Sequence, residues 1–181
     1  MPISEATYER IALEDPEANW ELVCGRLRRK PEMTQEHNDV ITLLGHYLQQ
    51  QLPLGQYTVR TNMSRTRLRL GNYYVPDVSV IPESQRRGQA GTKGLETYDE
   101  PLPLVVEVWS PSTGEYDVTE KLAGYRERGD AEIWLVHPYE RTITAWRRRP
   151  DGSYQESRFA EGEVQVEALP GVTIRVASLF R

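Results

Sequence analysis

The chain has 181 residues, a length that predicts one domain (1–181) with a sizeable core. Apolar residues make up 38% of it and charged residues 27%, which is typical of a globular protein and excludes intrinsic disorder. The longest apolar stretch, 102–109, is too short to span a membrane, and the N-terminus has no signal-peptide pattern. Because Cys24 is the single cysteine, an internal disulfide and a zinc ribbon are excluded. These features predict a cytoplasmic protein without a membrane partner.

The formal net charge of −5 argues against general affinity for nucleic acid, but the basic residues are clustered. Of the 22 basic residues 19 are Arg, and they gather in segments 26–30, 60–69 and 147–149. The middle group has no acidic residue between Gln56 and Pro76 and consists of Arg60, Arg65, Arg67 and Arg69. Arginine suits bidentate contact with phosphate, so this group is a candidate nucleic-acid contact. The alternative, which the pattern alone favours, is a solvated strand face paired with nearby acids.

The first half of the chain predicts helices and strands in alternation. A helix is expected over 4–13 with Ser4 as N-cap, followed by a hairpin over 20–27 that turns near Gly25. A second helix should begin after Thr34 and end before Pro53. One or two strands are expected over 57–70 and a short one over 75–81. Segment 83–103 is expected to be a loop.

The second half begins with the almost continuously apolar segment 104–109, which predicts a strand buried on both faces. A helix over 118–128 should follow, with Asp117 as N-cap and Gly129 as its stop. A strand over 132–136, a hairpin turning at 150–152 and a last strand within 164–180 complete the chain. This order predicts an α/β fold around a central mixed sheet.

Two acids lie inside apolar strands. Glu107 interrupts the segment Leu-Val-Val-Glu-Val-Trp, and Asp77 is flanked by valines on the preceding strand. A buried carboxylate without a partner costs several kcal/mol, so each needs a metal ion, a base or a raised pKa. Carboxylates on adjacent strands are typical ligands of Mg²⁺. A strand-end acid bonded to loop amides is the structural alternative; for two such acids together we favour the metal.

Two further residues are candidates for the same site. Lys121 shares a helical face with Val118, Leu122 and Tyr125, so its ammonium could approach the carboxylates. The alternative is that Lys121 passes the edge of the core to reach solvent. Glu36 lies close to the inward stripe of its helix, although an acid in a first turn also complements the helix dipole.

In their order these residues resemble a known motif. Pro76-Asp77, Glu107-Val108-Trp109 and Lys121 resemble the PD-(D/E)XK motif of the restriction-endonuclease-like nuclease superfamily. Nearly the whole chain is similar to the Uma-two family of endonucleases within it. The matching stretches are 20–27, 36–37, 76–78, 105–113, 116–117, 120–121, 134–138, 169–171 and 179–180.

The resemblance implies a core of helix, three strands, helix and strand. It implies that Asp77, Glu107 and the carbonyl of Val108 bind Mg²⁺, with Mn²⁺ as a possible substitute, and that the chain forms a homodimer. The superfamily places its lysine two residues after the glutamate, where this chain has Trp109; related families move it to the following helix, where Lys121 lies.

The sequence thus predicts a metal-dependent endonuclease that hydrolyses phosphodiester bonds of nucleic acid, with DNA as the expected substrate. The metal would polarise the phosphate and activate water, Lys121 would orient that water, and Glu36 would tune the site or hold a second metal. The first alternative is a catalytically silent member that binds nucleic acid or a protein. The second is a scaffold whose buried acids are structural.

Overall fold

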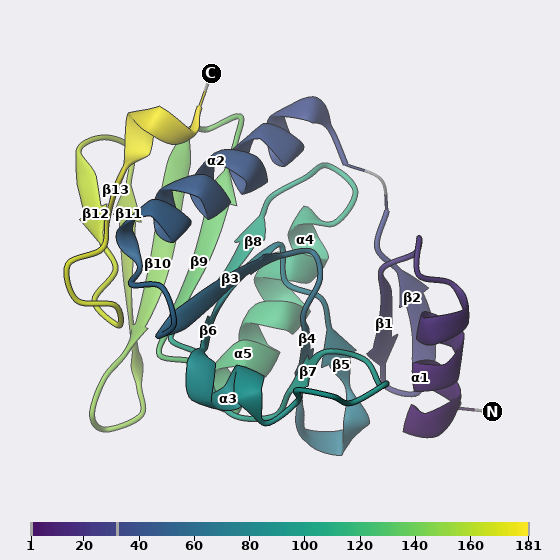
Figure 1. The fold of residues 1–181 in the computed structure, drawn as a ribbon. Coiled ribbons are helices and arrows are strands. Elements are labelled where there is room, and N and C mark those ends of the chain that lie inside the picture. Colours follow the sequence, from purple (N-terminus) through teal and green to yellow (C-terminus); the bar gives the residue numbers. More distant parts are fainter. Residues whose placement is uncertain (1, 32, 181) are drawn as a thin grey trace.

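A central mixed sheet organises the protein in the computed structural model, which describes residues 2–31 and 33–180 (Figure 1). Its six strands run in the order β11-β10-β9-β8-β6-β3, and only β8 and β9 are parallel. In chain order they are β3 (Tyr57–Thr61), β6 (Val78–Pro82), β8 (Leu104–Val108), β9 (Glu132–His137), β10 (Thr142–Arg148) and β11 (Tyr154–Phe159).

Helices cover both faces of this sheet. On one face α2 (Gln35–Gln51) packs through Val40, Leu44 and Leu48 against alternate strand residues such as Val106. On the other face α5 (Leu122–Arg128) contributes Tyr125 to a cluster with Val105 and Ile133. Because β8 is apolar on both sides, it is fully buried between these layers. The succession α2, β3, β6, β8, α5, β9 confirms the core implied by the resemblance.

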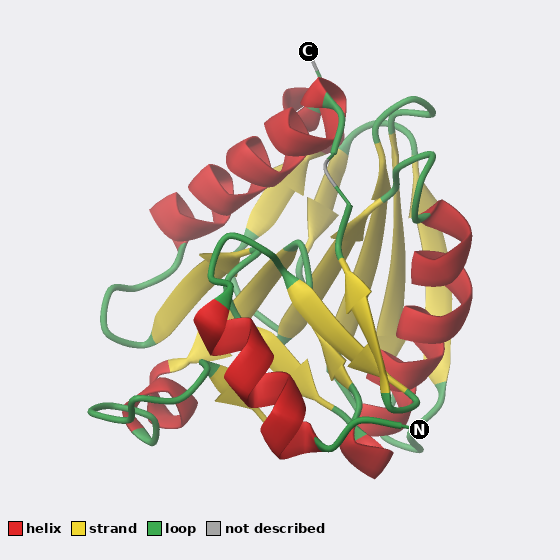
Figure 2. Cartoon of the chain, turned by 90° about the vertical axis from the view of Figure 1, so that its right-hand side faces the viewer, coloured by secondary structure: helices red, strands yellow, loops and turns green. Residues whose placement is uncertain are grey.

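A second sheet of five strands lies beside the first and is built largely from the N-terminal part. Its order is β2-β1-β5-β4-β7, so β2 forms an edge. The strands are β1 (Trp20–Val23), β2 (Arg26–Arg29), β4 (Arg65–Arg67), β5 (Tyr73–Tyr74) and β7 (Thr97–Tyr98). Helix α1 (Glu5–Glu14), capped by Ser4 as predicted, packs on this sheet through Tyr8. Figure 2 shows the β1–β2 hairpin between α1 and the helical segment that follows β8.

The C-terminal residues form the hairpin β12 (Glu163–Gln165) and β13 (Thr173–Arg175), then a 3-10 turn at Val176–Leu179. These elements complete the core beneath α2. The predicted hairpins, the predicted helices α1 and α2 and the mixed sheet are therefore confirmed.

Four local predictions were wrong. The expected loop 83–103 contains a helix, α3 (Glu83–Arg87), and strand β7. The helix expected from Val118 begins earlier, as α4 (Gly114–Tyr116), and widens into a π-helical turn, η2 (Asp117–Lys121), before α5. Asp117 is consequently inside the helix rather than capping it. The wide turn also shifts the helical phase, so Val118 is exposed while Lys121 is buried.

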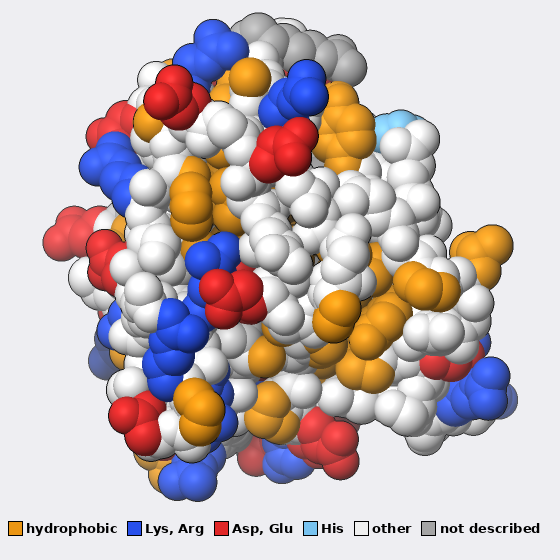
Figure 3. All heavy atoms as spheres, turned by 90° about the vertical axis from the view of Figure 1, so that its left-hand side faces the viewer, with side chains coloured by type: hydrophobic (Ala, Val, Ile, Leu, Met, Phe, Trp, Pro, Cys, Tyr) orange, Lys and Arg blue, Asp and Glu red, His pale blue; other side chains and the backbone are white. Residues whose placement is uncertain are grey.

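The surface around the C-terminal strands carries both signs of charge. Figure 3 shows Lys and Arg groups interspersed with Asp and Glu groups on this face. The C-terminal strands and their flanking residues form ion pairs, including Arg147–Glu167, Arg158–Glu140 and Arg175–Glu163. Within the described residues, no helix has the length and apolar character needed to cross a bilayer.

Candidate active site

Asp77 and Glu107 lie on neighbouring strands of the central sheet. The β6–β8 register pairs Val78 with Val106, so one further step places Asp77 opposite Glu107. Both carboxylates are almost fully buried, at 1% and 3% exposure. The two acids that the sequence singled out are thus brought together at one end of the sheet.

Three groups contact the carboxylate of Asp77. Its Oδ2 accepts hydrogen bonds from the backbone N–H of Val108 (2.7 Å) and from His37 Nε2 (3.2 Å). Its Oδ1 lies 2.6 Å from the ammonium of Lys30. Burial acts to raise the pKa of Asp77, but the charge of Lys30 and the contact with His37 outweigh it and hold that pKa well below its usual range.

Glu107 has one engaged oxygen and one free oxygen. Its Oε1 accepts from the hydroxyl of Tyr125 (2.5 Å) and lies 3.2 Å from Lys121 Nζ. Its Oε2 is buried without a hydrogen-bond partner among the described residues. Burial raises the pKa of Glu107 to about 8, against the opposing pull of Lys121. A buried carboxylate oxygen without a partner is costly, so this oxygen is available to a ligand.

The ammonium of Lys121 lies among three carboxylates. It is 2.9 Å from Glu21, 3.2 Å from Glu107 and 3.5 Å from Asp117. Burial disfavours the ammonium, but these acids together raise the pKa of Lys121 well above its usual range, so it stays charged. The prediction that Lys121 faces the sheet next to Glu107 is confirmed, and the alternative in which it reaches solvent is wrong because the side chain is buried.

Glu132 shows what a purely structural strand acid looks like in this fold. It lies at the start of β9 and is fully buried. Its Oε1 accepts from Trp134 Nε1 and Arg147 Nε, and its Oε2 accepts from the backbone N–H of Ala168. Both oxygens are satisfied. Glu107 differs from it by its unpartnered oxygen, which is why burial alone does not explain Glu107.

Sequence reasoning missed several members of this cluster. Glu21 carries the same signal as Glu107, an acid between apolar strand residues, and could have been found. Lys30 was noted only within the basic segment 26–30 and His37 only within the matching stretch 36–37, because their loop and helix meet Asp77 only in the folded chain. Asp117 was interpreted as a helix cap, yet its carboxylate accepts from the hydroxyl of Thr113 and pairs with Lys121.

Among the described residues Glu36 makes no hydrogen bond or ion pair with the buried cluster, and its predicted role in the site stays a prediction. It is exposed, and its carboxylate accepts from the hydroxyl of Tyr139 at 3.4 Å. The inward stripe of α2 consists of His37, Val40, Ile41, Leu44 and Leu48, one position beyond the stripe that would include Glu36.

The four arginines predicted to contact nucleic acid do not form one free surface. Arg60 is paired with Glu96 at 2.9 Å, and Arg67 with Glu5 at 2.8 Å and with Asp99 at 3.7 Å. Arg65 is only 9% exposed. Arg69 alone of the four is exposed and without an ion pair to the described residues. The alternative of a strand face paired with acids therefore describes this group better.

Trp109 occupies the position of the in-strand lysine and has a packing role. Its ring stacks on His137 with centroids 4.3 Å apart. On another side it lies against Gly114, where an added Cβ would come within 1.9 Å of Trp109 Nε1. The ammonium beside Glu107 is therefore supplied by the helix alone.

The residues at this site fit a magnesium ion. No group of three or more His, Cys, Asp or Glu in the described chain has the arrangement of a closed metal cage. Mg²⁺, however, is usually held by one or two carboxylates together with water and substrate phosphate. Asp77 and Glu107 provide two carboxylates, one with a free buried oxygen. The cluster also places four buried acids around two ammonium groups, Lys30 and Lys121.

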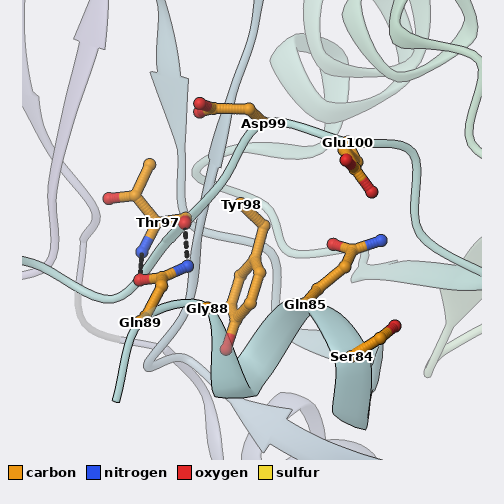
Figure 4. A pocket seen from close by; sticks show the side chains of 8 residues that line it. All are labelled: Ser84, Gln85, Gly88, Gln89, Thr97, Tyr98, Asp99 and Glu100. Atoms are coloured by element: carbon orange, nitrogen blue, oxygen red, sulfur yellow. Dashed lines mark hydrogen bonds between the residues drawn. The ribbon is translucent and has the colours of Figure 1, made fainter. Parts of the chain in front are cut away.

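A cavity lies away from the residues of this site. It measures about 440 Å³ and lies between α3 and segment 97–100 (Figure 4). Because α3 follows the C-terminal end of β6 and Asp77 precedes its N-terminal end, the cavity is at the opposite end of that strand. The side chain of Gln89 there holds the backbone of Thr97, and the lining includes Asp99 and Glu100. An acidic lining does not suit a phosphate ligand.

Comparison with known proteins bears on this arrangement. Residues 6–177 match the Uma2 family, described as "Putative restriction endonuclease". The chain belongs to the Uma2 family. A solved structure from Anabaena variabilis, "a putative nuclease belonging to DUF820", is similar in fold with a TM-score of 0.74 and 18% identity, and the similarity covers 88% of each chain. No curated protein matches the sequence. Membership in the Uma2 family supports nuclease function in general, and the fold is that of the restriction-endonuclease-like nucleases.

Proposed function

We propose that this Uma2 protein is a Mg²⁺-dependent endonuclease that hydrolyses phosphodiester bonds in DNA. The observation that carries the proposal is the unpartnered, buried Oε2 of Glu107, a residue that pairs with Lys121 and lies opposite Asp77 on the neighbouring strand. Family membership supports the nuclease part of this proposal, and the two buried carboxylates on neighbouring strands support the divalent ion.

In this proposal Asp77, Glu107 and the carbonyl of Val108 hold the ion, with Mn²⁺ as a possible substitute. When bound, the ion would polarise the scissile phosphate and lower the pKa of its water. The Val108 N–H and His37 fix the orientation of Asp77, and Tyr125 fixes that of Glu107. Lys121 stays charged and offsets negative charge that develops on the phosphate.

A cleavage assay with purified protein tests this function. Single- and double-stranded DNA and RNA are incubated with Mg²⁺, with Mn²⁺ or with EDTA. We expect DNA cleavage with either metal and none with EDTA, and loss of metal binding by calorimetry in Asp77→Asn and Glu107→Gln. Folded protein that cleaves no nucleic acid with either metal would contradict the proposal. Metal-independent binding without cleavage would instead indicate the catalytically silent alternative.

A further inference from the structure

The densest basic segment of the sequence, 26–30, lies on the strand that ends at the candidate active site. Strand β2 is the edge of its sheet, and Lys30 follows it directly. The β1–β2 register places Arg28 opposite Glu21, the acid that binds Lys121. Because side chains alternate along a strand, Arg26, Arg28 and Lys30 share one face of β2. This face is directed toward the helical segment that carries Tyr116 and Lys121. The guanidinium of Arg28 lies 3.4 Å from the ring centroid of Tyr116 in α4.

The positive charge of this strand is not neutralised by the described acids. Arg26, Arg28 and Arg29 make no ion pair with any carboxylate of residues 2–31 and 33–180, whereas Arg60, Arg67 and Arg147 are all paired. Arg26 and Arg29 are exposed. A guanidinium stacked on an aromatic ring keeps its in-plane N–H groups free to donate, so Arg28 also retains donors for a phosphate.

Lys30, which follows β2 and pairs with Asp77, lines a pocket. The pocket measures about 220 Å³, and its lining includes Arg29, Asn38 and Asn62 together with the acid Glu17. The ammonium of Lys30 contacts Asp77, the side chain of Asn62 (2.8 Å) and the carbonyl of Val75 (2.9 Å). Lys30 therefore joins the basic strand to the carboxylate that we propose as a metal ligand.

We propose that β2 is the nucleic-acid contact of this protein: Arg26 and Arg28, on one face of β2, bind backbone phosphates of the nucleic-acid strand whose scissile bond lies at Asp77 and Glu107. This inference rests on the proposed function. At about 3.3 Å per residue, the segment from Arg26 to Lys30 is roughly 13 Å long, which is long enough to contact two or three consecutive phosphates. It replaces the surface around Arg60–Arg69, whose charges are mostly paired or buried.

The test compares two charge-matched double variants by fluorescence anisotropy in EDTA. Arg26→Gln/Arg28→Gln removes one exposed arginine and one stacked on a ring. The control, Arg69→Gln/Arg126→Gln, does the same elsewhere, because Arg126 lies 5.6 Å from the Trp146 ring centroid. The probes are labelled duplex DNA, single-stranded DNA and single-stranded RNA of one sequence, titrated over a series of salt concentrations. Circular dichroism checks folding, and Arg26→Gln alone avoids any loss of packing at Tyr116.

The β2 variant should bind duplex DNA roughly 10- to 100-fold more weakly at 0.1 M salt, with a log–log salt slope lower by about 1.8. The single variant should lose about half of that slope, and the control variant should match the wild type. If the wild type binds but the β2 variant keeps its affinity and slope, this inference is overturned while the proposed function stands. If the wild type binds none of the probes, this inference is overturned, and the cleavage assay with metal alone decides the proposed function. If the protein binds RNA more tightly than DNA, β2 remains the proposed contact surface, and the proposed substrate changes from DNA to RNA.

Discussion

At the scale of single residues, two buried strand acids, Glu107 and Glu132, show how a functional acid can be distinguished from a structural one. Glu107 has an unpartnered oxygen, while both oxygens of Glu132 accept hydrogen bonds. Since burial keeps Glu107 largely protonated at neutral pH, Glu107→Gln should change the free energy of unfolding by less than about 1 kcal/mol. It should nevertheless abolish metal binding and cleavage, measured by calorimetry and by nuclease assay.

Glu132→Gln is the matched control and should behave in the opposite way. An amide there would turn a donor toward Trp134 or Ala168 and leave Arg147 without its buried counter-charge. We expect a loss of about 2–4 kcal/mol in chemical denaturation, with metal affinity and cleavage per folded molecule unchanged. If Glu132→Gln also lost metal binding, the distinction between the two acids would fail.

Lys121 is a second residue whose catalytic role can be distinguished from its contribution to stability. Lys121→Met keeps the length of the side chain but leaves Glu21, Glu107 and Asp117 without a counter-ion. The free energy of unfolding should therefore fall by about 3–5 kcal/mol in EDTA, and Mg²⁺ should restore part of it. Cleavage should fall roughly 10²- to 10³-fold while metal affinity persists or rises. Full turnover in this variant would remove Lys121 from the catalytic machinery.

Lys30 competes with a metal ion for the same oxygen. Its ammonium lies 2.6 Å from Asp77 Oδ1, so a bound cation must displace it. Lys30→Met should consequently tighten Mn²⁺ binding, by about tenfold if one interaction of roughly 1.4 kcal/mol is lost. Lys93→Met, at an exposed loop position, is the control and should leave the affinity unchanged. Weaker Mn²⁺ binding in Lys30→Met would mean that the ammonium supports the metal rather than competing with it.

At the scale of elements, the helix after β8 is positioned by a glycine. An added Cβ at Gly124 would lie 2.4 Å from Leu68 Cδ2 and 2.8 Å from Tyr74 Cε2, so α5 approaches the N-terminal sheet closely. Helix propensity alone predicts that Gly124→Ala stabilises the protein by about 1 kcal/mol. We expect the opposite sign, a loss of about 1–3 kcal/mol, because the contact is overpacked.

The neighbouring position provides the control for this prediction. Ala123 is exposed on the same helix, so Ala123→Gly should cost only the propensity difference of about 1 kcal/mol. Thermal unfolding of both variants checks the pair. Stabilisation by Gly124→Ala would show that α5 can move away from the sheet without loss.

The elements also show what the sequence alone could predict. Apolar periodicity and capping residues located α1, α2, β8 and both larger hairpins, since these signals are local. The π-helical turn η2 has no such signal; it follows from the packing that brings Asp117 and Lys121 to Glu107, so the predicted face of Val118 was wrong. Short strands such as β5 exist only because a neighbouring strand pairs with them.

The same reasoning explains how much of the site was predictable. Asp77 and Glu107 could be found because a charge within an apolar strand is itself anomalous. Their partners Glu21, Lys30 and His37 come from segments whose approach depends on how the two sheets meet. The acids that neutralise Arg60 and Arg67 are distant in sequence, so counting charges within 56–76 could not reveal them.

At the scale of the whole molecule, the site joins the two sheets through charge, and pH should therefore change global stability. Burial raises the pKa of Glu107 to about 8 and also raises that of Asp117. In the unfolded chain these groups titrate near pH 4. Between about pH 4.5 and 8 the folded state thus binds more protons than the unfolded state, and stability must fall as pH rises.

The expected slope follows from this difference in bound protons. Each additional proton on the folded state corresponds to about 1.4 kcal/mol per pH unit. Asp77 does not mask the effect, because its lowered pKa affects stability only in acid, below this window. Urea unfolding in EDTA at pH 5, 6, 7 and 8 should show a steady loss of stability. Glu107→Gln, which stays neutral throughout, should flatten the loss.

Mg²⁺ should oppose this loss, because the ion binds the deprotonated carboxylates. At a concentration 100 times the dissociation constant it should add about 2.7 kcal/mol to the free energy of unfolding. The gain should grow from pH 6 to pH 8 as the proton on Glu107 ceases to compete. It should be absent in Glu107→Gln and retained in Glu132→Gln. A gain that is independent of pH, or that persists in Glu107→Gln, would place the ion elsewhere in the molecule.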